Sequence, residues 1–497
     1  MTVTVRSDKQ VWSARALVLV LAAVLACLSV MLINGEPLYY FDTGSYIRQG
    51  SVALDSLFPP VVEDGGQGGA ATADKDDTAT GSRSLIYGLV MASFLRANAL
   101  SLVPILHLCV VFLMAWLLAK TAIRSLGGFQ NIITLTTVPL LVAATTSLPF
   151  YIAYMMPDIF APVMLMAIAA LTAFGPKMRI WELLLISGLA LLCSVLHPSH
   201  MAIAGLMIPF VILAALVRKM PGRWRATVLM VAVLALSVAE RKAFQITVET
   251  TTNKEVVYTP HITARLIVDG PGMDYLNDVC PDAEIPTCTL HEALSWSDDP
   301  YRLTASHIIF ERSPRLGSFR RLPKEDQKQI ALTQRDFAKD VFLSHPFATT
   351  WALINNGYRQ VLRDSIDMTI PSDIELNNAH RLAGITETQQ ELIRGGLLSV
   401  DRSWIEPIDV LHSSIYLISF VYIVIMLLIP GRVSPDVKLF ALFILIGIAV
   451  NAIVCGGVSQ PADRYGARVM WLLPFSAAFL YLARTAGTPR ISAGEAS

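Results

Sequence analysis

Six polar residues stand at the edges of long apolar stretches in this 497-residue chain, where a charged group is expensive to bury. Their types suit group transfer from a substrate that carries a phosphate. A carboxylate can act as a general base toward an acceptor hydroxyl, and paired guanidinium groups can neutralise a departing phosphate. The six residues are Asp42, Asp158, His197, His200, Arg464 and Arg468.

Asp42 is the strongest of the six because it lies among aromatic side chains just after the first apolar stretch. An acid among aromatic rings is hard to explain as a contribution to solubility. The rings can desolvate the carboxyl group and raise its pKa toward that of a useful base. They can also stack on a sugar ring, so we expect Tyr40 and Tyr46 to bind substrate. The sequence predicts that Asp42 is the catalytic carboxylate.

The other five residues each have a structural alternative. Asp158 directly precedes an apolar stretch and is a candidate helix N-cap. His197 and His200 form a polar turn, or, being three apart, share a helical face that could bind a metal. Arg464 and Arg468 are four apart and share a face if the segment is helical. They would then bind lipid headgroups or clamp a phosphate.

The composition is that of a membrane protein. The chain is 54% hydrophobic and 16% charged, with a mean hydropathy of +0.53, whereas soluble domains carry about 25% charged residues. This excludes an ordinary cytosolic enzyme and a disordered chain. Lysines and arginines number 39 and acids number 39, so there is no excess of basic residues for nucleic acid binding. The pattern predicts an all-α polytopic membrane protein.

Ten apolar stretches are candidates for membrane-spanning helices, which need about 20 residues each. Residues 84–95 are apolar but too short to span, so we expect an interfacial or re-entrant helix there. Basic residues precede the first stretch as in a signal peptide, but its apolar run continues past Cys27, which favours an uncleaved anchor. The ten stretches are about 13–33, 99–119, 131–149, 159–175, 181–197, 201–217, 226–240, 409–430, 437–456 and 468–484.

The positive-inside rule orients these spans. With ten spans, the basic residues of the N-terminus, of four loops and of the C-terminal tail all fall on the cytoplasmic side. Both termini are then cytoplasmic, and the six polar residues gather at the extracytoplasmic ends of the spans. The basic residues are Arg6, Lys9, Arg15, Lys120, Arg124, Lys177, Arg179, Arg218, Lys219, Arg223, Arg225, Arg432, Lys438, Arg484 and Arg490.

Three parts follow from this topology. Residues 1–240 form an N-terminal membrane module of seven spans with a first external loop at 34–98. Within that loop, the Gly- and Ala-rich stretch 59–82 is a linker or a segment that orders over a bound substrate. Residues 241–408 form a mainly helical extracytoplasmic domain, and residues 409–497 form a C-terminal module of three spans.

The extracytoplasmic domain contains Cys280 and Cys288, the two cysteines that lie well away from the spans. Outside the cytoplasm we expect them to form a disulfide. His291 leaves a metal site with both thiolates as the alternative. Helical periodicity in 325–343 and 346–364 predicts an apolar face that rests on the core of the domain or on the membrane surface.

The arrangement of the chain resembles the GT-C superfamily of membrane glycosyltransferases. Members of that superfamily carry a catalytic aspartate just after the first span, where Asp42 stands in Tyr39-Tyr-Phe-Asp-Thr-Gly-Ser-Tyr46. Many have a second acid between spans three and four, which Asp158 matches. A helix in the first external loop and a large insertion after span seven also fit. Asp42 is not part of an Asp-x-Asp pair, which leaves metal dependence open.

The resemblance implies an enzyme that moves a sugar from a polyprenyl-phosphate or polyprenyl-diphosphate donor to an acceptor outside the cytoplasm. The donor is then a lipid-linked sugar, and the acceptor is a glycan, a lipid or a protein. No cofactor is implied with certainty, and a divalent metal stays open. Such a protein would reside in the membrane among its lipids, and we expect a bacterial inner membrane.

Three other functions compete with this expectation. A polysaccharide polymerase or O-antigen-type ligase also uses arginines and histidines on the external face, and is itself a transferase. A transporter or flippase of lipid-linked glycans needs charges near the bilayer midplane, and the span interiors hold almost none. A noncatalytic assembly protein built around residues 241–408 is the third alternative.

Overall fold

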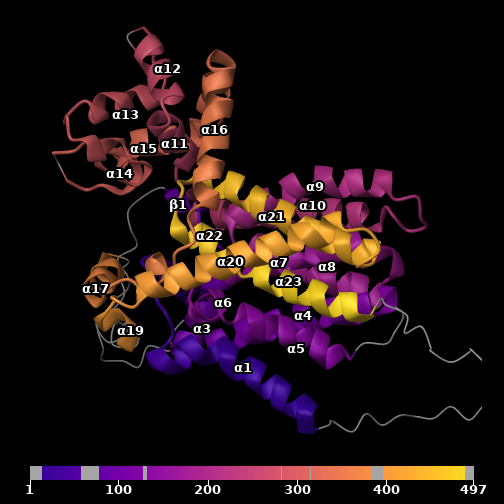
Figure 1. Ribbon diagram of the computed structural model, residues 1–497. Helices are drawn as coiled ribbons and strands as arrows, with labels where there is room; N and C mark the ends of the chain where they lie inside the picture. Colours follow the sequence, from indigo (N-terminus) through magenta and orange to yellow (C-terminus); the bar gives the residue numbers. More distant parts are fainter. Residues whose placement is uncertain are drawn as a thin grey trace, which may run out of the picture.

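The computed structural model is a bundle of helices with a smaller helical lobe at one end (Figure 1). It describes residues 14–57, 78–126, 131–280, 282–313, 315–382 and 396–486. Within these ranges seven helical segments are long and apolar enough to cross a membrane, as expected of a polytopic integral membrane protein. The seven are Ala14–Asn34 (α1), Leu102–Ser125 (α4), Pro157–Lys177 (around α7, Phe160–Phe174), Pro198–Val217 (α9), Ile405–Leu428 (α20), Pro435–Val458 (α21) and Asp463–Arg484 (α22, Asp463–Met470, then α23, Leu472–Ala486).

Three of the ten expected spans fall outside this set, each for a physical reason. The stretch 131–149 is divided between α5 (Ile132–Ala143) and α6 (Leu148–Ala153), with a turn between them. The stretch 181–197 forms α8 (Ile180–Val195), which has only 16 residues. The stretch 226–240 begins α10 (Arg225–Thr252), a helix of 28 residues whose second half is polar.

At the end of the bundle opposite the lobe, one carboxylate joins the ends of three helices to the start of a fourth. Asp436, at the start of α21, accepts hydrogen bonds from Ser125 at 2.9 Å and from Lys177 at 2.7 Å, and it also pairs with Arg218. These three partners stand at or just beyond the ends of α4, the α7 segment and α9. All three helices therefore end where α21 begins.

The direction of the remaining helices follows from these contacts. Because α4 and α7 run in the same direction, α5 and α6 must return between them, and α8 returns between α7 and α9 for the same reason. Lys438 donates to Leu427 O at 2.8 Å, so α20 ends beside the start of α21. Arg225 donates to Pro176 O at 3.4 Å, so α10 also starts at that end. In the described residues, ten segments thus traverse the bundle in alternating directions.

The centre of the bundle is α7, in which every residue from Phe160 to Phe174 is buried. A helix that is apolar on all sides is stable only when other helices surround it. At the lobe end, α2 (Thr43–Leu57) packs against α3 (Leu85–Arg96), the short helix expected at 84–95. A Cβ atom on Gly50 would lie 1.9 Å from Gly88 O, so this close approach requires glycine.

The lobe has a hydrophobic core of its own, made of residues between Ala264 and Val341. Two three-residue strands, β1 (Thr78–Thr80) and β2 (Glu255–Val257), pair in parallel between the first loop and the segment after α10. The lobe helices are α11 (His261–Val268), α12 (Pro271–Val279), α13 (Thr287–Leu294), α14 (Ala305–Phe310) and α15 (Lys324–Ser344), and the chain returns through α16 (Pro346–Val361), α17 (Asp373–Leu382) and α19 (Leu397–Val400).

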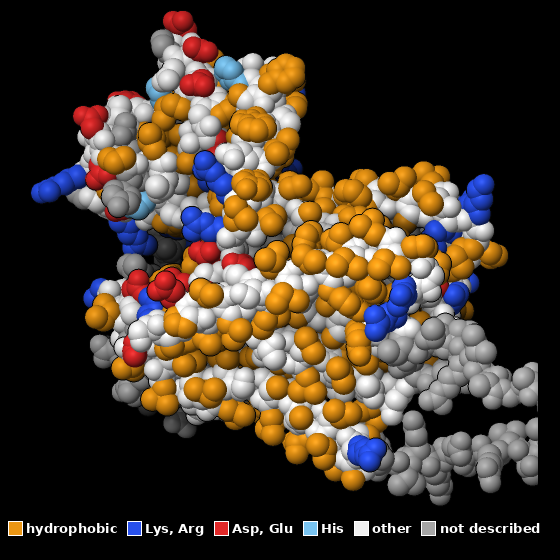
Figure 2. Space-filling view, in the orientation of Figure 1, with side chains coloured by type: hydrophobic (Ala, Val, Ile, Leu, Met, Phe, Trp, Pro, Cys, Tyr) orange, Lys and Arg blue, Asp and Glu red, His pale blue; other side chains and the backbone are white. Residues whose placement is uncertain are grey.

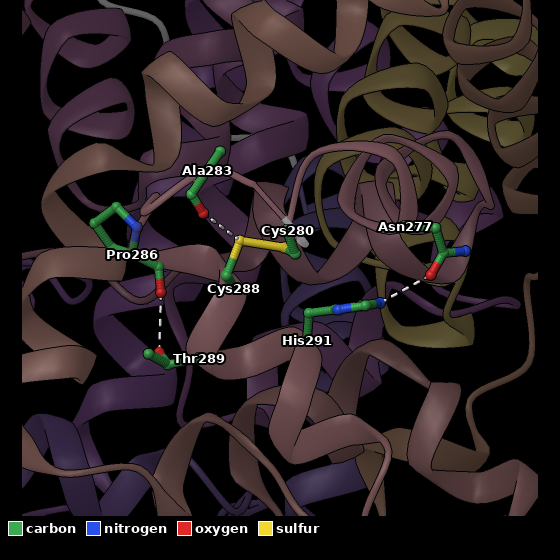
Figure 3. The surroundings of a disulfide bond; sticks show 7 residues. All are labelled: Asn277, Cys280, Ala283, Pro286, Cys288, Thr289 and His291. Carbon is green, nitrogen blue, oxygen red and sulfur yellow. Dashed lines mark hydrogen bonds between the residues drawn. A yellow bond between two sulfur atoms is a disulfide. The ribbon is translucent and has the colours of Figure 1, made fainter.

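The disulfide expected in the lobe is confirmed. Cys280 and Cys288 are bonded, with their Cα atoms 5.4 Å apart (Figure 3). His291 does not face the sulfur atoms to form a metal site, because its Nε2 lies 2.9 Å from Asn277 Oδ1. The bond ties the end of α12 to the start of α13.

Candidate functional site

Charged side chains gather at the lobe end of the bundle, whereas its flank is covered by hydrophobic ones (Figure 2). Asp42 belongs to this end. The chain leaves α1 through Gly35, whose positive φ of 79° suits glycine, and then forms an isolated bridge between Leu38 and Tyr154. The backbone carbonyl of Asp42 accepts from Ser45 N at 3.0 Å, so Asp42 occupies the N-cap position of α2.

The Asp42 side chain is held between two arginines. Arg83 Nη2 donates to Asp42 Oδ1 at 2.7 Å, and Arg464 Nη1 donates to Asp42 Oδ2 at 3.4 Å. The Asp42 side chain is 33% exposed and that of Arg83 is 24% exposed, whereas that of Arg464 is 6% exposed. A ligand that approaches from the aqueous side can therefore reach Asp42 and Arg83.

Behind this pair lies a sealed inner layer built on Asp158. Arg464 contacts the Asp158 carboxylate through both Nε (3.2 Å) and Nη2 (3.0 Å), which is the bidentate geometry of strong ion pairs. Arg468 Nη1 donates to Asp158 Oδ1 at 3.2 Å and is itself fully buried. Its Nη2 donates to Asn451 Oδ1 at 2.8 Å and to Ser199 Oγ at 3.3 Å.

The two arginines thus share a helical face, as their spacing indicated, but they lie at different depths. Arg464 links the two aspartates, whereas the Arg468 side chain is fully buried beneath it. A phosphate could contact Arg83 and the outer side of Arg464, whereas Arg468 supports the layer beneath. Asp158 stands in the helical turn Pro157–Ile159, and its side chain binds arginines rather than capping α7.

The environment of Asp42 lowers its pKa, the opposite of the expected effect. Burial acts to raise the pKa of the carboxyl group, as the aromatic neighbours suggested. The positive charges of Arg83 and Arg464, together with their hydrogen bonds, outweigh burial and hold the pKa of Asp42 below its usual range. In this structure Asp42 is therefore an ionised and weakly basic carboxylate.

The aromatic rings near Asp42 face arginines rather than an open cavity. The Arg464 guanidinium lies 4.7 Å from the centre of the Tyr40 ring, and the Arg83 guanidinium lies 5.3 Å from that of Tyr46. Both tyrosines are buried. Cation–π contacts of this kind fix the positions of the guanidinium groups. The expected stacking of Tyr40 and Tyr46 on a sugar would require these rings to move.

The histidines lie beside the inner layer. His197 Nδ1 is 2.8 Å from Ser199 Oγ, which in turn accepts from Arg468. His200 Nδ1 lies 2.8 Å from Cys193 O. Among the described residues no group of three His, Cys, Asp or Glu side chains could hold a metal ion. His197 therefore adjoins the network through Ser199, whereas His200 lies behind it, with the two imidazole rings 5.3 Å apart.

Arg83, Asn451 and Ser199 were not predicted from the sequence. Arg83 is brought to Asp42 by long-range pairing: β1 lies beside β2, and Ser82 Oγ accepts from Thr259 N at 2.9 Å. No local periodicity indicates such a pairing. Asn451 did offer a signal, since an amide inside an apolar span is costly unless it has a partner.

The charges of the network do not balance. Three guanidinium groups, of Arg83, Arg464 and Arg468, face two carboxylates, of Asp42 and Asp158. The excess of one positive charge at the mouth of the bundle suits an anionic ligand, and of the three arginine side chains that of Arg83 is the most exposed.

Comparison of the chain with protein-family models, with curated protein sequences and with solved structures gives no match.

Proposed function

We propose that the protein is a membrane glycosyltransferase that moves a sugar from a polyprenyl-phosphate-type donor to an acceptor on the extracytoplasmic face. The observation that carries this proposal is a partly exposed carboxylate between two arginines at the mouth of the bundle. The guanidinium groups could neutralise the phosphate of such a donor, and the carboxylate could accept the proton of the acceptor hydroxyl. The resemblance to the GT-C superfamily supports the same reaction.

The lowered pKa of Asp42 suggests how donor binding could activate it. A phosphate that takes over Arg83 and the outer side of Arg464 would compete with Asp42 for the same donors. Losing these partners and gaining a negative neighbour would raise the pKa of Asp42. The base would then become effective only when the donor is bound, which would limit wasteful hydrolysis.

In the reaction that follows, Asp42 takes the proton of the acceptor hydroxyl as its oxygen bonds to the anomeric carbon. The bond between that carbon and the phosphate oxygen breaks, and the lipid phosphate leaves with its charge neutralised by the arginines. Asp158 and Arg468 hold Arg464 in place from beneath. The products are a glycosylated acceptor and the free lipid phosphate.

This function needs the site on the extracytoplasmic side, and the alternating segments support that topology. If each of the ten segments crosses the membrane, both termini and the basic residues around Asp436 lie together on the side opposite the site. Lysines and arginines favour the cytoplasmic side. We therefore infer ten crossings, with α5–α6, α8 and α10 as the three that are short, broken or partly polar.

The proposed donor chemistry is tested by binding. Purified protein is titrated with undecaprenyl phosphate, and its thermal unfolding is compared with that in phosphatidylglycerol, an anionic control lipid. A ligand that binds only the folded state raises the unfolding temperature. We expect stabilisation by undecaprenyl phosphate that Arg83→Gln reduces. Equal stabilisation by both lipids would mean that the site does not recognise the carrier.

A further inference from the structure

Helix α16 carries an apolar stripe that is more than half exposed within the described protein. Phe347, Trp351, Ile354 and Tyr358 recur at spacings of four and three, so they share one face of the helix. Phe347 is 90% exposed and Trp351 is 69% exposed. Large aromatic side chains in a contiguous exposed stripe indicate a surface that is covered by something else.

The opposite face of α16 is firmly attached to the bundle. Gln360 Nε2 donates to Ala462 O at 2.8 Å, and Ala462 N donates back to Gln360 Oε1 at 2.9 Å. Gly456 on α21 allows the close approach, because a Cβ atom there would lie 2.5 Å from Asn356 O. The stripe is therefore held in a fixed orientation by the helix that carries it.

The axis of α16 lies across the long axis of the bundle (Figure 1). α16 stands upright in Figure 1, at a steep angle to α21 and to the other long helices, so it extends sideways from the lobe end of the bundle. Hydrophobic side chains line the side of α16 turned toward the flank of the bundle, and they continue onto the bundle itself (Figure 2). The two surfaces form the inside of a corner.

A bilayer surface would fit into this corner, with acyl chains along the flank of the bundle and headgroups along α16. α16 joins α21 near its C-terminal end, at Ile453 and Gly456, and Ile453 and Val458 are themselves 38% and 40% exposed on the apolar flank. The stripe is thus continuous with the lipid-facing surface of the spans, at the level where a span ends. Trp and Tyr are the residues that concentrate at the boundary between acyl chains and water.

We propose that α16 is an interfacial helix that lies along the phospholipid surface on the site side and fixes the height of the lobe above the membrane. Its apolar stripe enters the boundary between headgroups and acyl chains, as amphipathic helices in the membrane plane do. Phe342 and Leu343, 48% and 66% exposed in the last turn of α15, extend the same contact. The lobe would then hold β2, and through it Arg83, at a constant distance from the lipid.

The test measures thiol labelling in a bilayer. Single cysteines replace Phe347, Trp351 or Ile354 on the stripe, and Ala348 or Arg359, both exposed on its flank, as matched controls. The background carries Cys109→Ala, because Cys109 is the exposed free cysteine of the described residues while Cys27, Cys193 and Cys455 are buried. The full-length protein is reconstituted in phosphatidylcholine–phosphatidylglycerol vesicles, with a charged maleimide on both sides.

Only an ionised, hydrated thiol reacts readily, so we expect stripe cysteines to react on the order of tenfold more slowly than the flank controls in the bilayer. All positions should react equally after denaturation in dodecyl sulfate. Equal rates for stripe and flank in intact vesicles would overturn the proposal. The proposal would also be overturned if the stripe cysteines, slow at high protein density, reacted as fast as the flank controls at one copy per vesicle. A second copy of the protein, and not lipid, would then cover the stripe.

Discussion

At the scale of single residues, the pKa of Asp42 decides how the site can work. A carboxyl group with a lowered pKa stays ionised at lower pH and loses its basic form only under more acidic conditions. If donor binding removes its arginine partners, the pKa rises in the complex. The profile of kcat/KM reports the free enzyme and that of kcat reports the complex.

We therefore predict that the acid limb of kcat lies at higher pH than the acid limb of kcat/KM. Replacing Arg83 with Gln removes one positive charge beside Asp42, so it should move the acid limb of kcat/KM to higher pH. Both profiles are measured as initial transfer rates in proteoliposomes. Coincident acid limbs in the unmodified protein would contradict activation by the donor.

Arg468 gives a prediction about stability rather than activity. It is fully buried and holds Asp158, and breaking a buried ion pair typically costs about 3–5 kcal/mol. Arg468→Leu should therefore markedly lower the thermal unfolding temperature in detergent. Arg363→Leu is the control, because its pair with Asp463 is exposed and such pairs contribute about 0–1 kcal/mol. Similar unfolding temperatures for the two variants would refute a structural role for Arg468.

At the scale of elements, the disulfide should stabilise the lobe and leave the bundle unchanged, because the two have separate hydrophobic cores. The closed loop is short, so the chain-entropy model gives on the order of 2–3 kcal/mol. Limited proteolysis of a Cys280→Ser/Cys288→Ser variant should show faster cleavage within the lobe. The Cys109→Ala protein serves as the control, and unchanged lobe cleavage would count against this role.

Several elements could be predicted from hydrophobic pattern alone. The long spans, the short helix α3 and the two helices α15 and α16 follow from apolar runs and from spacings of three and four. The break between α5 and α6 could not be predicted, because both halves are equally apolar. α10 continues beyond its apolar half because tertiary packing and helix propensity, not hydropathy, decide where a helix ends.

The residues of the site that lie at the ends of apolar stretches could be predicted from the sequence. Asp42, Asp158, Arg464 and Arg468 were expected at one end of the bundle, and the structure joins them in one network. Arg83 depends on the pairing of β1 with β2, which lie far apart in the sequence. The depth of Arg468 and the direction of the Asp42 pKa depend on contacts that no sequence pattern encodes.

At the scale of the whole molecule, the alternating segments predict a topology. Epitope tags inserted at residue 300 in the lobe and at residue 220 after α9 should lie on opposite sides of the membrane, with 220 in the cytoplasm. Protease protection in sealed vesicles of known orientation measures this directly. A tag at 220 on the same side as a tag at 300 would require an even number of crossings between them, instead of the single crossing by α10, and would contradict the ten-span topology.

At this scale we propose that the bundle places one carboxylate, Asp42, where a lipid-linked sugar and its acceptor would meet. The most direct measurement is the rate of sugar transfer by purified protein in liposomes supplied with a panel of radiolabelled polyprenyl-phosphate sugars. Asp42→Asn is compared with Asp55→Asn, a change on the same helix at an acid that pairs with Arg96 at the surface.

Removal of a general base typically costs about 10²–10⁴ in rate. The account predicts that Asp42→Asn loses activity on this scale while it still inserts in the membrane and binds undecaprenyl phosphate, and that Asp55→Asn transfers sugar at the rate of the unmodified protein. Full transfer activity in the Asp42→Asn protein would contradict the account.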